Sequence, residues 1–152
     1  DPHTQRELIK NRADSYFTSF GSDSDFWKDS PDGSKYLDWL REKLKKFPAP
    51  IVCLYQHNKI IGQLEFGLLK DEPSIGYVNL YYLIPDFREK RLSSILNEYT
   101  ERHFKELNIK KLRLSVSPTN KIALRFYKKH GWVDLGQRSG VANVNFMEKV
   151  LL

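Results

Sequence analysis

The chain has 152 residues, of which 40% are hydrophobic and 29% are charged, and its formal net charge is +6. This length and composition predict one domain over residues 1–152 with a sizeable core, and they argue against disorder. No apolar run approaches the roughly 20 residues of a membrane span. The single cysteine, Cys53, excludes an internal disulfide and favours a cytoplasmic protein.

The excess of positive charge lies in the later part of the chain. Residues 1–50 carry nine Lys/Arg and nine Asp/Glu, whereas residues 51–152 carry sixteen and ten. A surface that binds nucleic acid is one interpretation of this charge. Because no zinc-ligand spacing, helix-turn-helix pattern or RNA-binding aromatic signature accompanies it, a phosphorylated cofactor is the preferred interpretation, and no metal is expected.

The chain opens with helical periodicity. A capping-box pattern at residues 4–7 and apolar residues at helical spacing predict a first helix from about residue 5 to residue 20. The acidic segment from Asp23 to Asp32 follows, and it contains Phe26 and Trp27. Aromatic rings among carboxylates suit a wall around a cationic amine. The alternative is a surface loop that two rings pin to the core.

A change of period then separates helical from extended sequence. A second helix is expected over residues 34–47, before Pro48 and Pro50. Alternation then predicts a hairpin and a long third strand. We expect these strands at residues 51–56, 60–69 and 75–84; later elements are a helix from residue 92, a strand at 111–117, a helix at 120–130 and strands at 133–135 and 144–150.

The stretch from Gly76 to Ser94 predicts an anion site. It reads as a buried strand, a proline stop, a basic loop with Arg88, Lys90 and Arg91, and the start of a helix. Unpaired N–H groups and the positive end of a helix dipole favour an anion at such a turn. A phosphate or pyrophosphate is therefore the expected ligand.

Residues 76–94 and 120–132 together resemble the two acetyl-CoA-binding motifs of the GNAT superfamily of N-acetyltransferases. The resemblance covers about residues 51–137. In the first motif, the Leu83-Ile84-Pro85 strand end and Arg88 match the family pattern. Arg91 stands where the family has its first glycine, and Ser93 stands where it has glycine or alanine.

The resemblance implies an α/β fold, with a mixed, mostly antiparallel twisted sheet that has helices on both faces. The family has one more strand before its first helix, so the resemblance also implies a missing strand upstream of residue 1. The implied cofactor is acetyl-CoA. Its expected contacts are Tyr81, Tyr82, Leu83, Arg88, Glu89, Lys90, Arg91, Leu92, Ser93, Ser94, Asn120, Ala123, Phe126 and Tyr127.

Arg91 is the main departure from the family pattern. If the loop needs a positive φ at this position, arginine costs roughly 1–2 kcal/mol of strain. If the residue has right-handed helical angles there is no such cost, and the guanidinium can pair with a phosphate instead. The expectation is a working but altered cofactor site.

The second motif matches more fully. In the family an asparagine that opens this helix contacts the pantetheine arm, and a tyrosine seven residues later reaches the cofactor sulfur. Asn120 and Tyr127 have this spacing, on one helix face. The alternatives are a helix cap for Asn120 and a core residue for Tyr127.

The resemblance also implies chemical roles. Tyr127, with an ordinary pKa near ~10, is the candidate acid for the departing thiolate, and the Leu83 N–H is the candidate donor to the acetyl oxygen. Family members place a glutamate at positions aligned with Tyr77 or Ser115, and this chain has a carboxylate at neither. Glu65 is the remaining candidate for the base; the alternative is an outward-facing, solvated side chain.

The sequence thus predicts an N-acetyltransferase that moves an acetyl group from acetyl-CoA to a primary amine of a small molecule. The expected contacts of the amine are Phe26, Trp27, Glu65 and Tyr81, and the protein is expected to be a monomer or homodimer. A non-catalytic CoA-binding domain and a basic nucleic-acid-binding module are the alternatives.

Overall fold

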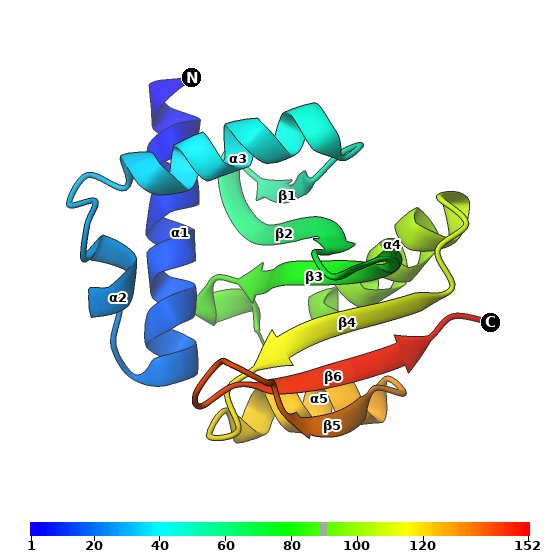
Figure 1. Cartoon of the computed structure of the whole chain (residues 1–152). Coiled ribbons are helices and arrows are strands. Elements are labelled where there is room, and N and C mark those ends of the chain that lie inside the picture. Colours follow the sequence, from blue (N-terminus) through cyan, green and yellow to red (C-terminus); the bar gives the residue numbers. More distant parts are fainter. Residues whose placement is uncertain (89–90) are drawn as a thin grey trace.

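The structure, a computed structural model, describes residues 1–88 and 91–152. Within these residues the chain forms a mixed sheet of six strands in the order β1-β2-β3-β4-β6-β5 (Figure 1). The strands are β1 (Ile51–Gln56), β2 (Lys59–Leu69), β3 (Glu72–Leu83), β4 (Lys111–Val116), β5 (Val133–Gln137) and β6 (Asn145–Val150). β3 and β4 pair in parallel and the other neighbours pair antiparallel, so the sheet is mixed and mostly antiparallel, as predicted.

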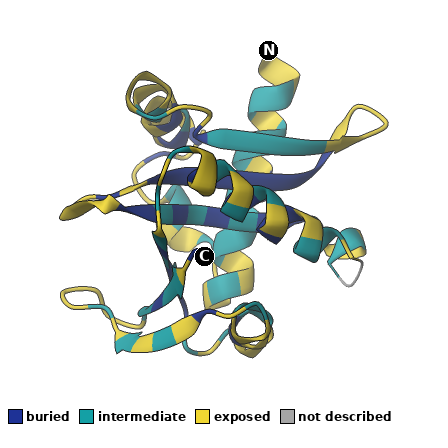
Figure 2. Cartoon of the chain, turned by 90° about the vertical axis from the view of Figure 1, so that its right-hand side faces the viewer, coloured by how far each residue is buried: buried dark blue, intermediate teal, exposed yellow. Residues whose placement is uncertain are grey.

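Helices cover both faces of the sheet. On one face lie α1 (Pro2–Phe20), the short α2 (Ser24–Trp27) and α3 (Ser34–Lys46). On the other face lie α4 (Leu92–Glu106) and α5 (Lys121–Lys129), and the short 3₁₀ helix η1 (Pro85–Phe87) precedes α4. Figure 2 shows that burial concentrates in the central strands, while the outer sides of the helices are exposed. No helix in the described part of the chain is both long and apolar enough to cross a bilayer.

The start of α1 differs from the prediction. The helix begins at Pro2, and the Asp1 side chain caps it by accepting a hydrogen bond from the Thr4 backbone N–H (2.9 Å). The expected cap at residue 4 is therefore wrong. Aspartate caps a helix as well as threonine does, and proline is preorganised for the first helical position, so the earlier pair sets the start.

The main core lies between the sheet and the helices α4 and α5. Its members from the sheet include Phe66, Val78 and Leu114, and they pack with Phe104 of α4 and Leu124 of α5. The opposite side of β2 is also buried, but there it carries polar groups under α1 and α3. This division gives the sheet one apolar face and one face with buried polar contacts.

A β-bulge in β3 changes which side chains face which helices. Glu65 pairs with Leu80 and Phe66 pairs with Val78, so Asn79 is an extra residue in β3. Side chains alternate along a strand, and one extra residue reverses the alternation. Val78 before the bulge and Tyr81 and Leu83 after it therefore all pack on the α4 and α5 side.

Candidate active site

β3 and β4 separate near their carboxyl ends. Their pairing runs from Gly76 with Leu112 to Val78 with Leu114. β3 continues to Leu83 and β4 to Val116, so the ends of the two strands face each other across an opening. The bulge at Asn79 lies directly after the last pair, which is where a bend in β3 opens the sheet.

A cavity of about 1090 Å³ occupies this opening. Its walls include Arg12 and Tyr16 of α1 on one face of the sheet and Ala123 and Tyr127 of α5 on the other. Because α1 and α5 cover opposite faces (Figure 1), the cavity reaches both faces through the gap between the strands. We call the part next to α1 the α1 side and the part next to α4 and α5 the α5 side.

The Leu83 N–H points into this gap. The neighbouring Ile84 N–H donates to the Ile61 carbonyl of β2 (2.9 Å), and Leu83 pairs with Gly62. Backbone donors alternate in direction along an antiparallel strand, so the Leu83 N–H faces away from β2 and toward the side from which β4 has separated. A backbone donor is thus available where the sequence predicts one.

Tyr127 lines the cavity from α5. Its ring packs near Tyr81 (5.8 Å between ring centroids) and Trp132 (5.9 Å). Burial raises the pKa of the Tyr127 hydroxyl above its ordinary value, so this group stays protonated at neutral pH and can donate a hydrogen bond. The Tyr81 pKa is raised by burial as well.

Asn120 is the N-cap of α5 and lines the cavity. Its Oδ1 accepts a hydrogen bond from the Ala123 N–H (3.2 Å). The predicted alternative, a capping role, is therefore present. The cap uses only the side-chain carbonyl, so the amide nitrogen is a separate donor at the cavity wall.

The start of α4 resolves the question of strain at Arg91. This residue is the N-cap of α4, with φ −58° and ψ −1°, so it has right-handed angles and carries no strain. The arginine side chain is exposed. Ser93, two residues on, lines the cavity.

Arg88 anchors the end of β3. Its Nε donates to the Leu83 carbonyl (2.8 Å) and its Nη2 donates to Oδ2 of Asp14 (2.9 Å). The Tyr82 hydroxyl donates to the same Asp14 oxygen. Arg88 and Tyr82 line the cavity, and these contacts fix the strand end against α1.

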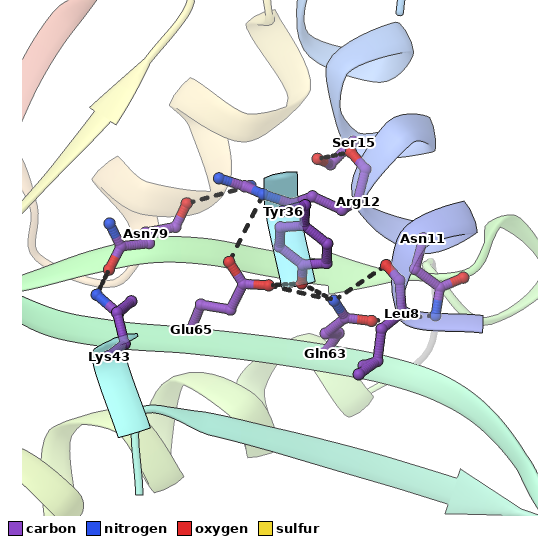
Figure 3. Close-up of polar contacts among 9 residues, drawn as sticks. All are labelled: Leu8, Asn11, Arg12, Ser15, Tyr36, Lys43, Gln63, Glu65 and Asn79. Carbon is purple, nitrogen blue, oxygen red and sulfur yellow. Dashed lines mark hydrogen bonds and ion pairs between the residues drawn. The ribbon is translucent and has the colours of Figure 1, made fainter. Parts of the chain in front are cut away.

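Glu65 is buried, with no exposed surface. Oε2 of its carboxylate accepts hydrogen bonds from the Tyr36 hydroxyl and from Gln63 Nε2 (3.2 Å), and Oε1 lies 3.6 Å from Nε of Arg12 (Figure 3). Arg12 Nη1 also donates to the carbonyl of the bulge residue Asn79 (3.4 Å). The outward-facing alternative is therefore wrong, yet the residues that line the cavity include Arg12 and not Glu65.

The structure brings together most of the predicted cofactor residues. Tyr81, Tyr82, Leu83, Arg88, Ser93, Asn120, Ala123, Phe126 and Tyr127 line the cavity. Arg91, Leu92 and Ser94 are not among its lining residues, nor are Phe26 and Trp27. The predicted contacts Glu89 and Lys90 lie outside the described residues.

Phe26 and Trp27 form an aromatic cluster beside the cavity. Phe26 packs against Tyr16 (5.5 Å), Trp27 (4.7 Å) and Tyr36 (5.9 Å), and Trp27 Nε1 donates to Asp23 (3.1 Å). These contacts correspond to the alternative in which two rings pin the segment. It is Asp25 from the same segment that lines the cavity.

Sequence reasoning missed Arg138, which follows β5 and lines the α1 side. Its Nη1 donates to the hydroxyls of Tyr77 (3.4 Å) and Ser115 (3.2 Å), which are hydrogen-bonded to each other (2.7 Å). Tyr77 and Ser115 are the two positions where the family resemblance suggests a carboxylate. The residues around position 138 contain no pattern that predicts the contact of Arg138 with Tyr77 and Ser115, because this contact depends on the pairing of β5 with β6.

Known proteins share the sequence pattern and the fold of this chain. Residues 8–132 match the Acetyltransferase (GNAT) family, whereas the comparison with curated proteins finds no match. The fold is similar to that of PaiA N-acetyltransferase from Thermoplasma acidophilum, solved in complex with coenzyme A (TM-score 0.76, 19% identity, 95% of this chain and 91% of that chain covered).

The fold is also similar to two other solved structures. One is ribosomal-protein-alanine N-acetyltransferase from Brucella melitensis (TM-score 0.71, 15% identity, 97% and 93% covered). The other is an acetyltransferase from Thermus thermophilus (TM-score 0.70, 17% identity, 97% and 92% covered). At these low sequence identities, the similarity to solved structures shows the fold alone. The family is shown by the match of the sequence over residues 8–132. The chain belongs to the Acetyltransferase (GNAT) family and is an acyltransferase.

Proposed function

We propose that this protein transfers an acetyl group from acetyl-CoA to a primary amine of a small molecule, by direct attack in a ternary complex. One observation carries the proposal: the Leu83 N–H and the Tyr127 side chain meet at one cavity that reaches both faces of the sheet. The acetyl donor, acetyl-CoA, and the amine that accepts the acetyl group can thus enter from opposite faces and meet in the gap between β3 and β4.

The α5 side fits coenzyme A. The backbone of β3 beyond Val78 is released from β4 and can pair with an extended, amide-containing arm, much as a sheet edge pairs with a peptide. The Asn120 amide lies on the same wall. The N-terminus of α4, with Ser93 at the cavity and an unstrained Arg91 at the cap, suits the phosphates. The Thermoplasma protein of similar fold was solved in complex with coenzyme A, which supports coenzyme A as the cofactor.

Acetyl-CoA would supply an activated acetyl thioester and a thiolate leaving group. In our proposal the Leu83 N–H donates to the acetyl oxygen, where negative charge develops during attack. The Tyr127 hydroxyl donates to the departing sulfur. Because burial raises the pKa of Tyr127, the phenol keeps its proton and stabilises the sulfur mainly through the hydrogen bond.

The acceptor must lose a proton before or during attack, because a free alkyl ammonium has a pKa near ~10.4. Glu65 was the predicted base, but its carboxylate is held by Arg12, Tyr36 and Gln63 and does not line the cavity. We therefore assign Glu65 a positioning role: it holds Arg12, which in turn holds the bulge of β3. The proton then leaves through water in the open cavity.

The test is thiol release from acetyl-CoA in the presence of a panel of small primary amines. Tyr127→Phe should lower kcat by about 100-fold or more, a typical loss when one hydrogen-bond donor to developing negative charge is removed, with little change in acetyl-CoA affinity. Tyr55→Phe is the matched control, because Tyr55 lies exposed on β1 and outside the cavity. Acetyl-CoA binding without thiol release for any amine would instead favour a non-catalytic CoA-binding domain.

A further inference from the structure

The α1 side of the cavity contains an arginine that is held in place by neutral groups. Nη1 of Arg138 donates to the Tyr77 hydroxyl (3.4 Å) and to Oγ of Ser115 (3.2 Å). The guanidinium lies over the ring of Phe146 (4.7 Å to the centroid) and near the ring of Tyr77 (5.8 Å). Two hydroxyls and two aromatic rings therefore fix the plane of this cation.

The other arginines of the cavity have carboxylate partners. Arg12 lies 3.6 Å from Glu65, and Arg88 lies 2.9 Å from Asp14. Among residues 1–88 and 91–152, by contrast, no ion pair joins Arg138 to a carboxylate. Arg138 is only partly exposed, and a partly buried cation gains most from an anionic partner when it is already fixed in position.

The hydrogen bonds of Arg138 leave part of its donor set for a ligand. Within the described residues, the hydrogen bonds of its guanidinium come from Nη1 and go to Tyr77 and Ser115. A guanidinium has five N–H donors, and its geometry matches the two oxygens of a carboxylate. Nε and Nη2 form such a pair of donors on the other edge of the plane.

The place of this cation in the cavity decides what it can bind. Tyr77 and Ser115 lie on β3 and β4 just beside the last strand pair, Val78 with Leu114, so Arg138 lies next to the gap through which the acceptor must reach the thioester. Val78 and Leu114 pack in the core with Tyr127, so their neighbours Tyr77 and Ser115, and Arg138 with them, face the opposite, α1 side. A ligand group at Arg138 therefore belongs to the acceptor and not to coenzyme A.

We propose that the acceptor is an amine that carries a carboxylate, such as an amino acid, and that Arg138 binds this carboxylate. The proposal rests on the proposed N-acetyltransferase function and adds the class of acceptor. Its central point is that the guanidinium donates to both Tyr77 and Ser115, and that no ion pair joins it to a carboxylate of residues 1–88 or 91–152. Such a site disfavours polyamines and other acceptors with several positive charges, because Arg138 repels them.

The experiment compares matched pairs of amines that differ by one carboxylate. Phenylalanine with phenethylamine and leucine with 3-methylbutylamine are suitable pairs, and phosphoethanolamine tests whether a phosphate replaces the carboxylate. For the wild type, kcat/KM should be at least ten-fold higher for the carboxylated member of a pair. Equal values, or a preference for the amine that lacks the carboxylate or carries a phosphate, would overturn the proposal while leaving the acetyltransferase function in place.

Variants of Arg138 separate recognition from folding. Arg138→Gln should lower the preference for the carboxylate by about 10- to 100-fold, mainly through KM of the acceptor, with the KM of acetyl-CoA unchanged. Arg138→Lys keeps the charge but not the two-donor edge, so it should retain part of the preference. Arg41→Gln is the control, since it removes one charge from an exposed site on α3.

A binding measurement covers the case in which no amine is acetylated. Calorimetry with coenzyme A and phenylalanine should then show saturable binding of phenylalanine to the wild type and about 10-fold weaker binding to Arg138→Gln. That result would support the carboxylate site although the acetyltransferase function had failed. Equal binding to both proteins, or no binding to either, would overturn the site.

Discussion

Replacing Glu65 by leucine should lower the free energy of unfolding substantially. Its effect on the rate of acetyl transfer should be the smaller one. The carboxylate has no exposed surface, and the Arg12 side chain beside it is 17% exposed. Removal of Glu65 leaves a largely buried guanidinium without its anion and the Tyr36 hydroxyl without its acceptor. Breaking one partner of a buried ion pair costs about 3–5 kcal/mol of unfolding free energy.

We expect the lower end of this range, about 3 kcal/mol, because Arg12 still donates to the Asn79 carbonyl and keeps some contact with water. For a protein of this size, each kcal/mol shifts Tm by about 2–4 °C. Glu65→Leu should therefore melt about 6–12 °C below the wild type. The double variant Arg12→Leu with Glu65→Leu should lose less than Glu65→Leu alone, because no unpaired charge remains buried.

Thermal and urea unfolding of the wild type, both single variants and the double variant measure this coupling. An unfolding free energy of Glu65→Leu within about 0.5 kcal/mol of the wild-type value would contradict this expectation. So would a double variant whose loss equals the sum of the losses of the two single variants. Turnover of Glu65→Gln well below its Tm completes the test. A loss of kcat by several orders of magnitude in a folded Glu65→Gln protein would return Glu65 to the role of base.

Three further predictions concern packing, the cofactor loop and pH. Gly76→Ala should cost about 1–3 kcal/mol, because a Cβ there would lie 2.6 Å from the Phe104 ring; Gly67→Ala should cost less in the same urea titration, since its Cβ would meet the end of a flexible lysine side chain. Arg91→Gly should weaken acetyl-CoA binding several-fold and reduce its salt dependence, because Arg91 has right-handed angles and glycine relieves no strain; tighter binding would contradict this, and no binding in either protein would end the cofactor proposal. Burial raises the pKa of Tyr127 in the folded state, so its contribution to stability is complete below the unfolded value near ~10 and is lost as pH rises through the folded value; the difference in unfolding free energy between wild type and Tyr127→Phe should change above pH ~10, and a constant difference up to pH 11 would refute it.

Local signals predicted the elements well where periodicity was strong. The hairpin, the long third strand and the helix after Asn120 follow alternation and capping, which nearby residues determine. The structure confirms these elements within a few residues. The start of α1 was missed, because two adjacent capping patterns competed and the sequence does not show which one wins.

The site could be predicted only where a motif covers consecutive residues. Asn120 and Tyr127 belong to one helix, and their spacing places both at the cavity. Arg138 and Glu65 show why the rest could not be predicted. Arg138 reaches the cavity through the pairing of β5 with β6 and β6 with β4. The surroundings of Glu65 depend on how α1 and α3 cross the sheet, which no short pattern encodes.

The extra residue in β3 affects how this strand responds to the deletion of a residue. Deletion of Asn79 would leave Val78 paired with Phe66 and Leu80 paired with Glu65, so the side chains from Leu80 to Leu83 would keep their faces and the bend at the bulge would be lost. This single-codon deletion would thus narrow the opening between β3 and β4 while leaving Leu83 and Tyr127 themselves unchanged.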